Sequence, residues 1–147
     1  MAAKIIRENF PDKTVRHVLE ETPRGLDFLE GVKDIIIMPI PDALSEFKPD
    51  LIMILDANTV DRITRMPEDA RAAIAGSGSK LVIIDHHEPT GVEDNDLYIN
   101  DFSPAVTFDI FDIFIGRLGL KKPAGYAQLA MTGIYTDTGG FVHRNLN

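Results

Sequence analysis

The sequence predicts an α/β fold in which a mostly parallel sheet is flanked by helices. Two short apolar runs, residues 51–55 (LIMIL) and 81–84 (LVII), are bounded by polar residues, as is typical of strands buried on both faces of a parallel sheet. An alanine-rich helix is predicted between them at residues 67–75, with acidic residues in its first turn and glycines after its end. A strand, a helix and a strand within roughly 30 residues form a βαβ unit with a right-handed crossover.

The chain before this unit is predicted to contain shorter elements. Residues 2–10 (AAKIIRENF) carry the apolar Ile5 and Ile6 among polar residues, which predicts a helix that ends before Pro11. A short strand is expected at residues 14–19 and a helical turn at residues 26–31. Residues 35–40 are apolar but include Pro39, which suits an edge or irregular strand.

Two helices are predicted after the unit, at residues 105–118 and 124–135, separated by residues 119–123. The first helix carries apolar side chains at helical spacing, so most of its phenylalanines are expected in the core. The residues that set this spacing are Val106, Ile110, Ile113 and Phe114.

Length and composition exclude several classes of protein. The 147 residues correspond to one domain, and 44% hydrophobic with 26% charged residues excludes disordered and fibrous chains. The absence of cysteine excludes disulfide scaffolds, thiolate zinc sites and cysteine nucleophiles, and agrees with a cytoplasmic location. The first residues lack a signal-peptide pattern, and no apolar run approaches the ~18 residues of a membrane span, so no membrane partner is expected.

The net charge also restricts how the protein can bind phosphates. The chain has 15 lysines and arginines against 23 aspartates and glutamates, a net charge of −8. Such a surface repels a nucleic-acid backbone, because binding to it draws on clustered basic residues. A phosphate site in this protein would therefore need local cations.

Acidic and imidazole side chains follow both predicted strands. Asp56 comes directly after the first strand, and Asp85, His86 and His87 come directly after the second. Ligands of open α/β sheets gather at the carboxyl ends of the strands, so these side chains are expected to share one site. The two histidines are expected to divide the tasks of holding a metal and contacting an anion, because adjacent strand residues point to opposite sides. The alternative for Asp56 is a residue that begins a helix. The alternative for the Asp-His-His tripeptide is a polar loop exposed to solvent.

A third feature lies near the end of the chain. Asp137 follows a predicted helix and is flanked by threonines and by two glycines, where the backbone can approach a ligand closely. The alternative is an exposed aspartate beside a glycine that ends the helix.

Taken together, Asp56, the Asp85-His86-His87 tripeptide and the segment 133–141 (GIYTDTGGF) resemble the DHH phosphoesterase superfamily. The superfamily includes single-strand-specific exonucleases, short-oligonucleotide and phosphoadenosine-phosphate hydrolases, cyclic-dinucleotide phosphodiesterases and manganese pyrophosphatases. The resemblance covers roughly residues 51–141. It implies that residues 1–147 form a DHH-type domain with a Rossmann-like, mostly parallel sheet flanked by helices.

The resemblance implies a role for each of these residues. Asp56, His86 and Asp137 match the family's metal ligands, with Asp56 bridging two divalent ions. His87 matches the histidine that contacts the substrate phosphate, and Asp85 orients the cluster, so these two are the expected catalytic residues. Carboxylate and imidazole ligands suit Mn²⁺ or Mg²⁺, and two such ions activate a water so that no protein nucleophile is required.

The chain departs from the family pattern at both ends. The family's first motif, H-x-x-x-D-x-D, is not found, and His17 is expected to be a strand residue without a ligand role. We therefore expect a domain that is incomplete at its N-terminus and stops before the family's second domain. The reduced ligand set predicts an inactive chain on its own, and uncovered sheet edges favour a homo-oligomer. His143 and Arg144 are expected on the solvated surface.

The predicted function is a metal-dependent phosphohydrolase that cleaves phosphodiester or phosphomonoester bonds of small nucleotides or short single-stranded oligonucleotides, as an exonuclease-like enzyme does. A manganese-dependent inorganic pyrophosphatase shares the ligands and is the alternative enzyme. A non-catalytic nucleotide-binding module that lacks the first metal motif is the alternative from another class, and a purely structural α/β domain is the plainest one.

Overall fold

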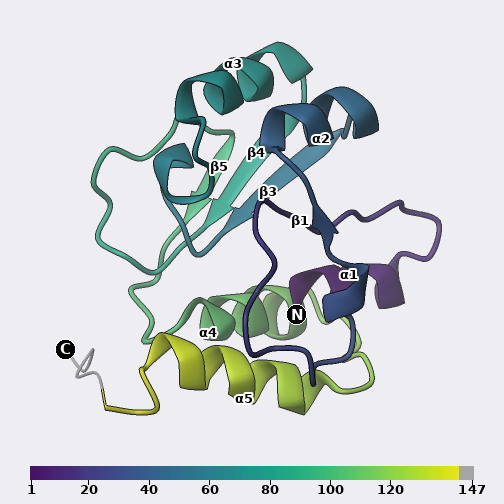
Figure 1. Cartoon of the computed structure of the whole chain (residues 1–147). Helices are drawn as coiled ribbons and strands as arrows, with labels where there is room; N and C mark the ends of the chain where they lie inside the picture. The colour runs from purple at the N-terminus through teal and green to yellow at the C-terminus, as the bar shows by residue number, and fades with distance from the viewer. Residues whose placement is uncertain (143–147) are drawn as a thin grey trace.

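A three-stranded parallel sheet forms the centre of the computed structural model, which describes residues 1–142 (Figure 1). Its order is β3 (Leu51–Leu55), β4 (Lys80–Ile84) and β5 (Leu97–Ile99). The pairing of β3 with β4 runs from Leu51 opposite Lys80 to Leu55 opposite Ile84. The two predicted apolar strands and the α/β class are thus confirmed, whereas β5 is an addition to the prediction.

A second, smaller sheet pairs β1 (Val18–Leu19) with β2 (Ile36–Ile37), also in parallel. The predicted strands at residues 14–19 and 35–40 are therefore confirmed only over two residues each. The predicted strand at residues 35–40 was too long, because the chain turns at Pro39 into helix α2 (Ile40–Phe47), which was not predicted.

Helices cover both faces of the larger sheet (Figure 1). The bounds of the remaining α-helices are α1 (Ala2–Asn9), α3 (Pro67–Ser77), α4 (Val106–Ile110) and α5 (Tyr126–Asp137). The single helix predicted at residues 105–118 is α-helical only in α4 and continues as a π-helical segment, Phe111–Arg117. The segment 26–31 forms turns and not the predicted helical turn, and short 3₁₀ helices follow at Val32–Asp34 and Val60–Arg62.

The core has two parts because successive strand side chains point to opposite faces of the sheet. On one face, Ile84 packs with residues of α1 and α4; on the other, Ile83 packs with Ala70 of α3. The strand β3 is less buried than predicted: Ile54 is buried, but Leu51 is 49% exposed because β3 lies at an edge of its sheet.

The phenylalanines of residues 105–118 are less buried than the sequence predicts. Phe114 is buried, whereas Phe108 and Phe111 are 43% and 39% exposed. The prediction that most of these rings belong to the core is wrong, since the helix buries only the side that faces the sheet and α5. No helix among residues 1–142 is both long and apolar enough to cross a membrane.

Close packing of α4 against α5 depends on Gly133, and its replacement by alanine tests this. A Cβ atom at position 133 would overlap the side chain of Thr107, which is 6% exposed. We expect Gly133→Ala to lower the free energy of unfolding by about 1–3 kcal/mol, measured by urea denaturation. The control is Gly76→Ala on α3, where the added Cβ meets open space. It should be neutral or stabilising by about 0.5–1 kcal/mol. Equal losses in both variants would contradict the packing argument.

Candidate metal centre

The carboxyl ends of β3 and β4 bring four of the five predicted site residues together. Asp56, Asp85, His86 and His87 each offer a ligand atom within 4.8 Å of the others. The pairing of Leu55 with Ile84 causes this, because it places the residues that follow both strands side by side. The geometry therefore joins the two motifs that the sequence places about 30 residues apart.

Asp56 leaves its strand in an unusual backbone conformation. Its φ of 65° lies in the left-handed region, and its amide still donates to the Ile84 carbonyl at 3.0 Å. Aspartate tolerates this region better than most residues, but the conformation costs free energy and often marks a functional site. The turn directs the carboxylate toward His86, with 3.1 Å between Asp56 Oδ1 and His86 Nε2.

The two histidines have different partners. His86, whose side chain is 8% exposed, donates from Nδ1 to the Ser103 carbonyl at 2.9 Å, so its Nε2 faces the cluster. His87 lies 2.7 Å through Nδ1 from Oδ1 of Asp85, which is fully buried. The His87 side chain is 38% exposed. The His86 ring thus directs Nε2 toward the Asp56 carboxylate. The His87 ring is held by Asp85 through Nδ1 and is partly open to solvent.

Two carboxylate oxygens at the site are buried without a hydrogen-bond partner among residues 1–142. They are Oδ2 of Asp85 and Oδ2 of Asp137. Burying a charged oxygen without a partner is costly, and such oxygens usually bind a donor or a cation. Carboxylate oxygens together with an imidazole nitrogen form a donor set that suits Mn²⁺ or Mg²⁺. The residues present therefore fit a divalent ion.

Asp137, the fifth predicted residue, lies beside this cluster and is not one of its four members. It is the last residue of α5. Burial raises its pKa and the charge of Asp56 raises it further, whereas His86, His87 and the Val106 backbone amide oppose the shift. The carboxylate at the end of α5 is therefore close enough to Asp56 and both histidines for their charges to act on it.

Burial also raises the pKa of Asp56, and the charge of Asp85 adds to the effect, while His86 and His87 oppose it. Raised pKa values at two neighbouring carboxylates mean that their negative charges are poorly compensated by the surrounding protein. A cation would compensate them, which is the electrostatic condition for a metal site.

Polar residues that no sequence motif indicated support the site from the side away from its ligand atoms. Asn100, directly after β5, donates to the His87 carbonyl at 2.6 Å and to the Tyr98 hydroxyl at 2.8 Å. Asn58, 2% exposed, donates to the Glu88 carbonyl at 2.9 Å. The rule that polar residues at strand ends gather at one edge would have found Asn100 had β5 been recognised.

A charged network anchors the loop that follows the histidines. Arg71 of α3 pairs with Asp61, with Glu68 at 2.8 Å and with Glu93 at 2.8 Å. Glu93 also accepts the Val60 amide at 3.0 Å, and Arg71 lowers the pKa of its carboxyl. The far end of the loop is thereby fixed to α3.

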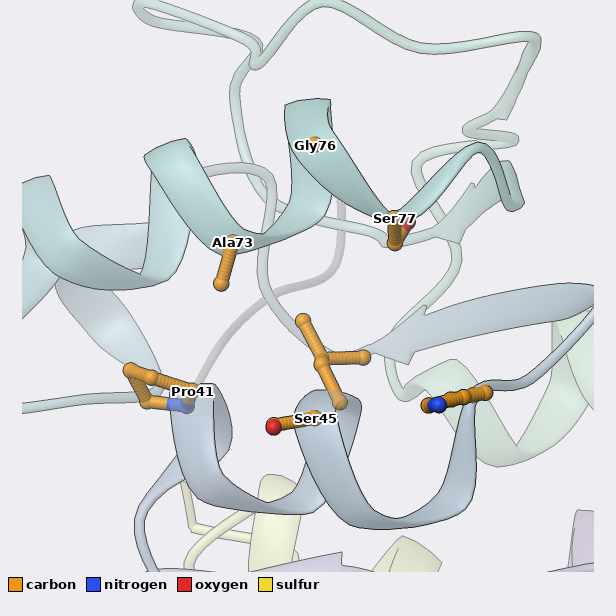
Figure 2. A pocket seen from close by; sticks show the side chains of 7 residues that line it. Pro41, Ser45, Ala73, Gly76 and Ser77 are labelled. Carbon is orange, nitrogen blue, oxygen red and sulfur yellow. The ribbon is translucent and has the colours of Figure 1, made fainter.

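Two other predicted features lie away from the site. Among residues 1–142, His17 is not part of the metal-ligand cluster, and its carbonyl accepts the Ile36 amide between β1 and β2. His143 and Arg144 fall outside the described residues. A surface hollow of about 450 Å³ lies between α2 and α3, lined by small side chains such as Ser45, Ala73 and Ser77 (Figure 2). It contains none of the site residues.

Comparison with known proteins supports a phosphoesterase likeness. No protein-family model matches the chain. Over 144 residues, 97% of its length, the chain is 26% identical to the bifunctional oligoribonuclease and PAP phosphatase NrnA of Bacillus subtilis (strain 168). The crystal structure of an exopolyphosphatase-related protein from Bacteroides fragilis matches 99% of the chain with a TM-score of 0.75 and 28% identity. The chain spans 41% of the first protein and 43% of the second.

The charged network predicts a ranking of two arginine variants. Arg71→Ala leaves the Glu93 side chain, which is 14% exposed, without its cation. It should lower the urea midpoint of unfolding clearly more than Arg65→Ala. Arg65 pairs with Glu21 where both side chains are mostly exposed, and such pairs contribute little. A midpoint for Arg71→Ala equal to that of Arg65→Ala would mean that the network does not anchor the loop.

The raised pKa of Asp137 predicts that this residue destabilises the metal-free protein. A carboxyl whose pKa is raised by folding costs stability above its folded pKa, and the cost fades as the pH falls through that value. Asp137→Asn should therefore raise the thermal midpoint of the metal-free protein at pH 7. The gain should shrink toward zero as the pH falls below the ordinary range of aspartate. A gain that grows at low pH would contradict the assigned shift.

Proposed function

We propose that the chain is a metal-dependent phosphohydrolase domain of the DHH type. The observation that carries this proposal is the cluster of Asp56, Asp85, His86 and His87 at the ends of β3 and β4. The similarity of the chain to a protein named as an oligoribonuclease and PAP phosphatase supports the same chemistry. The likeness to an exopolyphosphatase-related protein also supports phosphate chemistry.

Three groups would hold the ion: His86 through Nε2, and the carboxylates of Asp56 and Asp137. A bound Mn²⁺ or Mg²⁺ supplies a Lewis acid and an activated water for attack on phosphorus, and the complete family site is proposed to hold two ions. The metal charge would also attract a phosphate to an otherwise acidic protein.

His87 and Asp85 would act on the substrate side. The buried Asp85 carboxylate fixes the His87 ring through Nδ1 and leaves its Nε2 edge directed away from that anchor. From there the imidazole can donate a hydrogen bond to a phosphate oxygen and orient it for in-line attack. Asn100 limits movement of the same residue by holding the His87 carbonyl.

The proposed substrates are phosphodiesters or phosphomonoesters of small nucleotides and short single-stranded oligonucleotides. The likeness to NrnA favours this class. A phosphoanhydride substrate is the second candidate, and the likeness to an exopolyphosphatase-related protein favours it. Both candidates use the same ligands and differ in the bond that is cleaved.

Metal binding tests the proposal directly. Calorimetric titration with Mn²⁺ should show saturable binding, and His86→Ala should weaken it at least tenfold because it removes a ligand nitrogen. His17→Ala is the matched control, since His17 lies outside the cluster, and it should bind Mn²⁺ as the wild type does. Wild-type protein that binds no Mn²⁺, or equal affinity in all three proteins, would contradict the proposal.

Hydrolysis assays with Mn²⁺ on a short RNA, PAP and polyphosphate separate the candidate substrates. Release of mononucleotides or of phosphate from PAP, abolished in His86→Ala, supports the phosphoester class. Cleavage of polyphosphate alone supports the second candidate. Turnover that His86→Ala abolishes would overturn the expectation of an inactive chain, whereas binding of Mn²⁺ and nucleotide without turnover would agree with the reduced ligand set and with a non-catalytic binding module.

A further inference from the structure

Ser103 connects the metal cluster to a buried carboxylate that has no assigned role. Its backbone carbonyl accepts the His86 Nδ1 proton at 2.9 Å. Its hydroxyl lies 2.7 Å from Asp109 Oδ2 and 2.8 Å from the Ala105 carbonyl. A single residue therefore contacts the proposed ligand through its backbone and Asp109 through its side chain.

Burial of the Asp109 carboxylate costs folding free energy. It is 2% exposed, and burial raises its pKa. Within residues 1–142 no lysine or arginine forms a salt bridge with it, so its charge is supported chiefly by the Ser103 hydroxyl. A buried carboxylate with so little compensation destabilises the fold, which points to a purpose other than stability.

The turn that carries Ser103 would not hold its shape unaided. Phe102, the residue before it, adopts a left-handed φ of 51° and leaves its ring 65% exposed. Its amide donates to Asn100 Oδ1 at 2.9 Å, which fixes one side of the turn. Asp109, from the start of α4, fixes the other side through the Ser103 hydroxyl. Such a strained conformation persists only when its surroundings over-determine it.

We propose that Asp109 is a positioning residue that acts through Ser103 to orient the His86 ring. With the Ser103 carbonyl held in place, Nδ1 carries the proton and Nε2 is left facing Asp56, where a metal would bind. The functional meaning of this inference rests on the proposed metal role of His86, whereas the orientation itself is a property of the metal-free protein.

Nuclear magnetic resonance of the metal-free chain tests the orientation. In ¹⁵N-labelled wild type, His86 should show a slowly exchanging Nδ1 proton, assigned by its absence in His86→Ala. Ser103→Ala, which keeps the Asp109 charge, and Asp109→Ala should both lose or broaden this signal. Ser103→Thr retains the hydroxyl and should restore it, while Asp112→Asn, an exposed carboxylate paired with Arg117, is the charge-matched control.

Mn²⁺ titration gives the second readout. Ser103→Ala and Asp109→Leu should weaken Mn²⁺ binding about 10- to 100-fold, as loss of a group that orients a ligand does, whereas Ser103→Thr and Asp112→Asn should not. Asp109→Leu removes the acceptor but fills a similar volume, and it covers the case in which the cavity left by Asp109→Ala prevents folding.

Folded Ser103→Ala and Asp109→Leu variants with an unchanged Nδ1 proton and unchanged Mn²⁺ affinity would overturn the inference and leave Asp109 a merely structural residue. If the wild type binds no Mn²⁺, the proposed function fails, and the Nδ1 proton alone still decides whether Asp109 orients His86.

Discussion

The parallel pairing of β3 with β4 is the constraint on which the rest of the structure depends. Its register sets Leu55 opposite Ile84, so the two strands end at the same level. Asp56 and the Asp85-His86-His87 tripeptide then emerge at one edge. A shift of one residue would send every strand side chain to the opposite face of the sheet, which would exchange the faces on which Ile83 and Ile84 pack, disrupt both parts of the core and separate the ligands. The core and the site are therefore specified by the same pairing.

The residues of the site lower the stability of the fold. Asp56 has a strained backbone, two carboxylate oxygens are buried without a hydrogen-bond partner in the described part of the chain, and the pKa values of Asp56 and Asp137 are raised. Clustering of such features is typical of sites arranged for a ligand and not for stability. The surrounding hydrogen bonds offset this cost. Polar residues outside the cluster hold each histidine and the loop behind it, namely Asn58, Asn100, Ser103, Arg71 and Glu93.

Much of the fold could be predicted because strong local patterns agree with the tertiary structure. The strands β3 and β4 are apolar runs flanked by polar residues, and α3 has acidic residues at its start and a glycine after its end. The missed elements carry weaker signals. The three residues of β5 are a strand only because β4 pairs with them, and α2 begins beside two prolines that favoured an irregular strand. The change from α- to π-helix after Ile110 has no sequence signal of this kind.

The sequence by itself determined the fold class and the candidate site residues of this protein: an α/β chain with an aspartate after one apolar strand and Asp-His-His after the next. Those residues are close in sequence to the strands that place them, so periodicity and strand-end position were enough to find them. Only the tertiary structure decided how they are held. The partners of His86 and His87 come from Ser103 and Asn100, which reach the site only because β5 pairs with β4. Contacts between distant segments depend on packing, which no local pattern encodes.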